Sequence, residues 1–211
     1  MEIFLRAKHW QLFLLTFAIP FLLQIVMMVS IFSHLLHQPN NVPDVTVVFS
    51  YLKLLPVIMV LYMGTLFGWQ FSVAIGLQKM VPAGVHMKVK KFKIFFFIPV
   101  IYLTLFLIFI SFILTLNFTN IGPSNFSYRL VFPFLLIIPL HFFSIFCIFY
   151  CLYFVAKTFK TVELQREVTF SDFMGEFFLV WFFPIGVWII QPKINKMIKE
   201  YNAPVGDVTQ E

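Results

Sequence analysis

Four long apolar runs are the feature of this sequence that most constrains its fold. Residues 11–36, 54–77, 94–116 and 130–156 are rich in Phe, Leu, Ile and Val, and they contain no Asp, Glu, Lys or Arg. A helix crosses a lipid bilayer with about 20 predominantly apolar residues. Each run is therefore long enough to form a transmembrane helix with some tilt.

The composition places the whole chain in the same class. Hydrophobic residues make up 61% of the 211 residues and charged residues 11%, whereas a soluble domain carries about 25% charged residues. One soluble core cannot hide so much apolar surface, so lipid must be its solvent. We predict an all-α, polytopic membrane helix bundle formed by residues 1–200, followed by a flexible polar tail at residues 201–211.

Basic residues predict which ends of the helices face the cytoplasm. The loops at 37–53 and 117–129 carry one Lys or Arg each, whereas the loop between the second and third runs carries five lysines and no acidic residue. Cytoplasmic loops are enriched in Lys and Arg, so this loop and both termini are predicted to be cytoplasmic. The same placement accounts for the net charge of +6 and predicts membrane lipids, not nucleic acid, as partners. The five lysines are Lys79, Lys88, Lys90, Lys91 and Lys93.

The N-terminus has some features of a signal peptide. Arg6 and Lys8 precede the first apolar run. That run continues past signal-peptide length, and no small-residue cleavage site follows it. We therefore expect it to be retained as the first transmembrane helix.

A fifth apolar stretch, residues 177–190, is too short to resemble the other four. At 1.5 Å per residue it spans about 21 Å, against a hydrocarbon core of about 30 Å. Pro184 and Gly186 interrupt it, and both residues weaken a helix. A crossing would also place Lys193, Lys196 and Lys199 outside. We predict a re-entrant or kinked helix broken at Pro184 and Gly186, with five full spans as the alternative.

Small residues recur every four positions in the second run, at Gly64, Gly68, Ser72 and Gly76. On an α-helix this spacing forms one smooth stripe. Such stripes allow another backbone to approach closely in lipid. The stripe predicts either packing within the monomer or an interface with a partner protein or a second copy.

Three polar residues form a candidate intramembrane polar site. Gln24 lies in the first run, His141 lies near the middle of the fourth, and Glu176 precedes the fifth stretch. Polar groups at membrane depth are functional candidates. A structural hydrogen bond between helices is the alternative for His141, with Gln24, at similar depth, as a candidate partner. For Glu176 the alternative to a gate or partner contact is a solvated helix start.

Motifs of enzymatic chemistry are absent from the sequence. It contains no P-loop, no Ser/His/Asp set and no His-rich metal motif. Cys147 and Cys151 lie four residues apart in an apolar run and are expected to be buried, inert thiols. We therefore predict that the chain is not an enzyme and that it binds no cofactor or metal.

Two segments suggest a family. "AKHWQLFLL" near the N-terminus and "FFPIGVWIIQPKIN" near the C-terminus resemble a family of small, uncharacterised bacterial inner-membrane proteins. In that family an aromatic-Pro-Ile-Gly segment leads into an Ile-Gln-Pro and Ile-Asn end. The resemblance implies location in the bacterial cytoplasmic membrane and carries no established activity or site residues.

Two functions fit these observations. The first is a non-enzymatic subunit or partner of a larger, transport-type membrane complex, indicated by the small-residue stripe and the lack of a catalytic motif. The second is a small transporter or membrane substrate-binding component. A broken helix at membrane depth is how many transporters form a site, which Gln24, His141 and Glu176 would then line.

Overall fold

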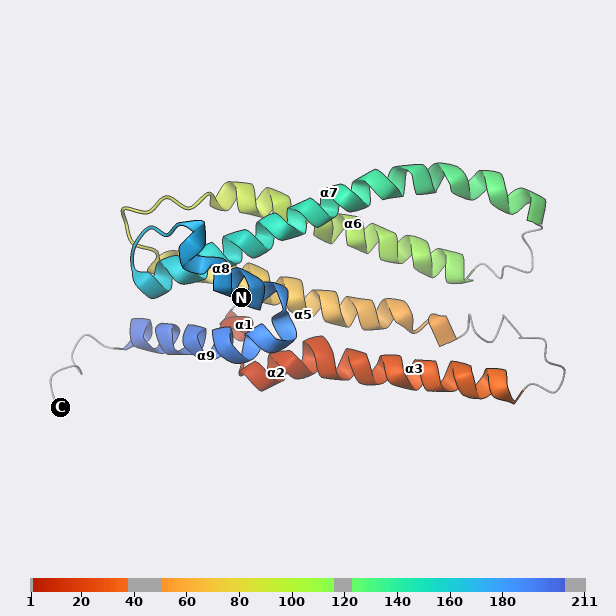
Figure 1. Ribbon diagram of the computed structural model, residues 1–211, viewed down its shortest axis with the longest axis horizontal. Coiled ribbons are helices and arrows are strands. Elements are labelled where there is room, and N and C mark those ends of the chain that lie inside the picture. Colours follow the sequence, from red (N-terminus) through yellow and green to blue (C-terminus); the bar gives the residue numbers. More distant parts are fainter. Residues whose placement is uncertain (1, 38–50, 116–122, 204–211) are drawn as a thin grey trace.

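The computed structural model describes residues 2–37, 51–115 and 123–203. Throughout these ranges the regular elements are helical, and they form one elongated bundle (Figure 1). Four helical stretches are long and apolar enough to cross a membrane: His9–Leu36, Leu55–Met80, Val89–Phe112 and Ile137–Leu164. The prediction of an all-α membrane helix bundle with four spans is confirmed.

The first span is assembled from three helical pieces. The short helix α1 (Glu2–Arg6) precedes it and turns at Ala7 and Lys8 into α2 (His9–Phe13), the π-helical turn η1 (Leu14–Ala18) and α3 (Ile19–Leu36). Pro20 occupies the first turn of α3 and has no N–H to donate. The wider π turn just before it, in which the Ile19 N–H donates to the Leu14 carbonyl, lets the chain pass the proline without ending the span.

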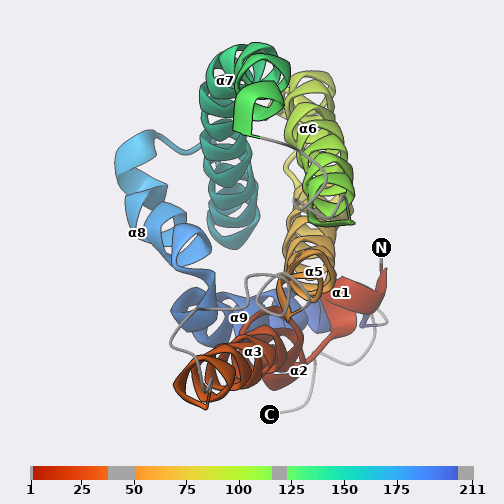
Figure 2. The same cartoon turned by 90° about the vertical axis from the view of Figure 1, so that its right-hand side faces the viewer.

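The remaining spans lie side by side along the bundle. Helix α5 (Leu55–Gly76) ends in the 3-10 turn η2 (Leu77–Met80), and α6 (Val89–Thr115) pairs with α7 (Pro123–Leu164). Seen end-on, α5 lies between the α6–α7 pair and α3 (Figure 2). At 42 residues, α7 is about 63 Å long and exceeds the thickness of a bilayer.

The C-terminal end of α7 departs from the expected loop. We expected the chain to leave the fourth helix near Ala156, but α7 continues to Leu164 and carries Lys160 and Glu163. The extra turns stay helical because they pack into the core: Phe159 and Val162 are buried on the same helix. Lys157, Lys160 and Glu163 therefore lie on α7 itself and not in a loop.

The fifth apolar stretch forms a helical hairpin. Helix α8 (Phe170–Trp181) and helix α9 (Phe183–Asn202) meet at Phe182, and α9 returns to the end of the bundle at which α8 began (Figure 1). Neither helix is among the four stretches able to span a membrane. The expected kinked C-terminal element is thus present, and the five-span alternative finds no support.

The start of α8 is defined by a capping box. Thr169 is the N-cap residue, and the Asp172 carboxylate accepts hydrogen bonds from the Thr169 backbone N–H and hydroxyl. Arg166 pairs with the same carboxylate at 2.9 Å. The Arg166 hydrogen bond, followed by those from Thr169, holds the pKa of Asp172 at about 2. This carboxylate is therefore ionised at neutral pH and faces the positive end of α8.

The break between α8 and α9 lies at Phe182, two residues before Pro184. Pro184 sits in the first turn of α9, where a missing N–H leaves no hydrogen bond unmade. Gly186 is needed for a different reason: a Cβ on it would overlap the backbone carbonyl of Leu179 in α8. Pro184 therefore starts α9, and Gly186 permits the tight approach that folds the hairpin.

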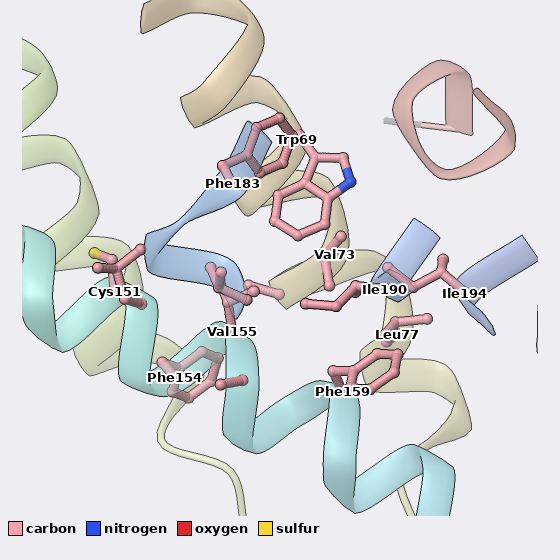
Figure 3. Packing of buried hydrophobic residues seen from close by; sticks show 14 of the residues in the cluster. Trp69, Val73, Leu77, Cys151, Phe154, Val155, Phe159, Phe183, Ile190 and Ile194 are labelled. Atoms are coloured by element: carbon pink, nitrogen blue, oxygen red, sulfur yellow. The ribbon is translucent and has the colours of Figure 1, made fainter. Parts of the chain in front are cut away.

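The bundle core lies where the hairpin meets α5 and α7. Trp69 is fully buried and its ring packs edge-on against Phe183 at 4.8 Å between centroids. Figure 3 shows these two rings together with two isoleucines of α9 and four side chains of α7: Ile190, Ile194, Cys151, Phe154, Val155 and Phe159. The opposite face of the hairpin exposes apolar residues suited to lipid: Phe170, Met174, Phe178, Trp181, Phe182, Ile185 and Trp188.

We predict that Gly186→Ala destabilises the hairpin, because the added methyl group meets backbone that cannot rotate away. Overpacking of this kind costs about 1–3 kcal/mol. Thermal unfolding of the protein in detergent measures the effect. Gly175→Ala is the matched control: it lies in α8 with open space around its Cβ position, so it should leave stability equal or higher by about 0.5–1 kcal/mol. Equal unfolding temperatures for the two variants would contradict this role of Gly186.

Candidate functional site

The most completely organised polar cluster in the described part of the chain centres on Gln191. This side chain is fully buried on α9. Its Oε1 accepts a hydrogen bond from the indole N–H of Trp69 at 2.7 Å. Its Nε2 lies 2.9–3.2 Å from the backbone carbonyls of Phe4, Leu5 and Ala7. One amide thus joins α5, α9 and the C-terminal end of α1.

Asn195 extends this cluster by one helical turn. Its Nδ2 donates to the Ala7 carbonyl at 3.1 Å, and its Oδ1 accepts from Gln191 Nε2 at 3.1 Å. The last carbonyls of a helix have no partner within the helix. Gln191 and Asn195 therefore cap α1 with side chains from the other end of the sequence. These are the Gln and Asn of the Ile-Gln-Pro and Ile-Asn segment, whose side-chain donors suit the capping of a helix or the binding of headgroups.

Two glycines of the small-residue stripe face this same helix. A Cβ on Gly68 would lie 2.7 Å from the Phe4 ring, and a Cβ on Gly76 would overlap Leu5. Ser72 between them is buried. Gly64 has no atom within 4 Å of its Cβ position and is exposed. Three of the four stripe residues thus lie in contacts within the chain, where Gly68 and Gly76 admit α1.

The three residues of the candidate intramembrane polar site lie in separate surroundings. His141 is exposed on α7 and its Nδ1 is 3.0 Å from the Tyr102 hydroxyl of α6. The partner of His141 is therefore Tyr102 and not the candidate Gln24. Gln24 lies on α3, on the far side of α5 from α7 (Figure 2).

Glu176 belongs to a chain of ion pairs at the hairpin. Its Oε1 lies 2.7 Å from Lys160 Nζ, which is 2.8 Å from Glu163. Glu163 in turn lies 2.8 Å from Lys193 Nζ on α9. The Lys160 and Glu176 side chains are less than one-fifth exposed, so solvent screens their attraction less than that of a surface pair. Glu176 thus ties α8 to α7, with a lysine of its own chain as its partner.

The thiols of Cys147 and Cys151 are free and buried on α7. They lie on one face of the helix, within its packed side, and Cys151 belongs to the main core. Their positions match the expectation of buried thiols.

The chain matches no family model, no curated protein and no solved structure. The resemblance to small bacterial inner-membrane proteins therefore stays a prediction.

We predict that Gln191→Leu destabilises the protein strongly. The substitution removes the side-chain partner of the Trp69 N–H and of the Phe4 and Leu5 carbonyls, while the Ala7 carbonyl keeps Asn195. An unpaired buried polar group costs about 1–3 kcal/mol. The same thermal unfolding measurement tests this. Gln78→Leu is the control, because Gln78 is only partly buried and bonds within its own span, to the Ala74 carbonyl one turn earlier. A Gln191→Leu variant as stable as this control would show that the cluster does not hold α1.

Proposed function

We propose that this protein is a non-enzymatic subunit of a larger, transport-type complex in the bacterial cytoplasmic membrane. Its polar residues at the hairpin are used to hold its own helices together. Such a subunit needs a lipid-facing surface that binds another membrane protein, and the exposed side of α3 suits this role.

Gln24 is a polar side chain near the middle of the first span, His9–Leu36. It makes no hydrogen bond to another residue in the ranges that the structure describes, and it lines a groove of about 600 Å³ on α3 with Phe21, Met28 and Phe32. Only Pro20 and Met27 of α3 are buried. An amide in lipid is stabilised by a hydrogen bond to another helix, so this face suits a helix that carries a polar group.

The transporter alternative would require Gln24, His141 and Glu176 to line one site. They lie instead on α3, α7 and α8, and two of them pair with neighbours in their own chain. This arrangement favours the subunit over the transporter.

The orientation is part of the proposal. The connection between α5 and α6 lies at the same end of the bundle as the last turns of α9 (Figure 1). That end carries Lys79, Lys88, Lys196 and Lys199, and the positive-inside rule assigns it to the cytoplasm. The C-terminus and the N-terminus would then both be cytoplasmic.

Gln24→Leu tests the proposed partner surface. Purification of the wild-type protein from its native membrane in a mild detergent should bring down a companion membrane protein in fixed stoichiometry. One interhelical hydrogen bond contributes about 0.6–2 kcal/mol in lipid, so the variant should recover roughly 3–30 times less companion. Leu22→Ala, on an exposed residue outside the groove, should recover it normally. A wild-type protein that purifies as a lone monomer would refute the proposal.

Cysteine labelling tests the orientation. In a background that lacks Cys147 and Cys151, Asn202→Cys should react with an impermeant maleimide only after the cytoplasmic face is opened, because Asn202 ends α9 at the basic end. His37→Cys, which lies at the other end of the first span, should react in intact cells. The reverse pattern would invert the topology.

A further inference from the structure

Two adjoining cavities of opposite character lie at the corner between α1 and α2. The first is a cavity of about 670 Å³ lined by Arg6, Lys8, Lys199, Asn195 and Asn202 together with a few apolar side chains. The second is a cavity of about 520 Å³ lined mainly by the apolar residues Phe4, Trp10, Leu14, Leu15 and Ile19. Arg6 lines both cavities, so the two are neighbours.

The first cavity is cationic. Three of its residues carry a positive charge, and no acidic residue lines it. Lys8 and Lys199 make no ion pair with any residue that the structure describes. Arg6 pairs with Glu2 at 3.3 Å, but both side chains are about 70% exposed, and an exposed pair of this kind contributes little. Glu200 on the neighbouring turn faces Lys196 at 3.8 Å. The cavity therefore keeps its positive charge available.

This donor set suits a phosphate ester. A guanidinium group and two ammonium groups form charge-assisted hydrogen bonds with phosphate oxygens. The exposed Asn202 amide adds a neutral donor, while the Asn195 amide is already engaged with Ala7 and Gln191. A phosphate could come from a lipid headgroup or from a soluble metabolite, and the second cavity distinguishes these sources.

The apolar cavity indicates a lipid. It runs along the beginning of the π turn, where Leu14 and Leu15 belong to η1. Isolated π turns occur frequently at functional sites. Trp10 is 44% exposed beside it, and tryptophan is enriched at the headgroup level of membranes. A soluble phosphate ester has no group that would occupy the apolar cavity beside its phosphate. The acyl chain of a phospholipid would occupy it.

We propose that the α1–α2 corner binds one anionic phospholipid, with its phosphate in the cationic cavity and an acyl chain along the apolar cavity. The site is formed where α9 meets α1, so its geometry depends on the contacts of Gln191 and Asn195. The phospholipid site shares no residue with the groove around Gln24. A test of the site is therefore independent of a test of the proposed subunit role.

Native mass spectrometry of the whole protein in detergent, titrated with phosphatidylglycerol, tests the site. Arg6→Gln, Lys8→Gln and Lys199→Gln together should weaken the first lipid bound by roughly tenfold or more, since each cation near a membrane surface contributes appreciably. The control combines Lys88→Gln, Lys90→Gln and Lys93→Gln, exposed residues around the start of α6. It removes the same charge and should change binding less than twofold. Equal losses in both variants would overturn the proposal in favour of diffuse attraction.

Two further ligands decide the occupant without any substitution. Phosphatidylcholine with the same acyl chains should bind the wild-type protein at least about tenfold more weakly than phosphatidylglycerol. Glycerol 3-phosphate, which lacks the chains, should compete poorly even at large excess. Equal binding of the two lipids would refute an anion site, and effective competition by glycerol 3-phosphate would assign the cavity to a soluble phosphate ester instead.

Discussion

The hydrogen bonds of one buried amide connect the two ends of this chain. Gln191 receives the Trp69 indole N–H and donates toward the last carbonyls of α1, so it holds the N-terminal helix, the second span and the C-terminal hairpin together. In an apolar interior a polar group must find partners, since leaving it unpaired costs far more than it would in water. The amide therefore specifies one arrangement of α1, α5 and α9 where apolar packing alone would allow several.

Close backbone approach complements this cluster. The hairpin closes because Gly186 has no side chain to collide with Leu179, and α1 reaches α5 because Gly68 and Gly76 leave room for Phe4 and Leu5. Helices in lipid gain no hydrophobic driving force from one another, so their association depends on such close contacts and on hydrogen bonds. Gly68, Gly76 and the Gln191 amide all contact α1. The ion pairs from Glu176 to Lys193 add a further link between α7, α8 and α9.

The contrast between the internally bonded hairpin end and the exposed α3 helix bears on function. The helices around α9 are joined by hydrogen bonds and ion pairs within the chain. The proposed phospholipid site lies beside them, at the α1–α2 corner. Beyond that corner, α3 buries only Pro20 and Met27. Its Gln24 lines an apolar groove and makes no hydrogen bond to another residue that the structure describes. In a protein built this way the hairpin end holds the chain's own helices together, while the exposed side of α3 is open to a helix of another protein.

Much of the architecture was predictable from the sequence. Long uncharged runs require membrane helices because backbone polar groups in lipid must pair within the helix, and the shortness of residues 177–190 indicated a broken element. The packing partners were not predictable. His141 pairs with Tyr102, 39 residues earlier in the chain, and Gln191 pairs with backbone 184 to 187 residues away. Composition and periodicity describe one helix at a time, whereas hydrogen bonds between helices depend on their rotation and depth. The sequence by itself therefore determined the class of fold and the number of spans, and only the tertiary structure decided which polar groups meet.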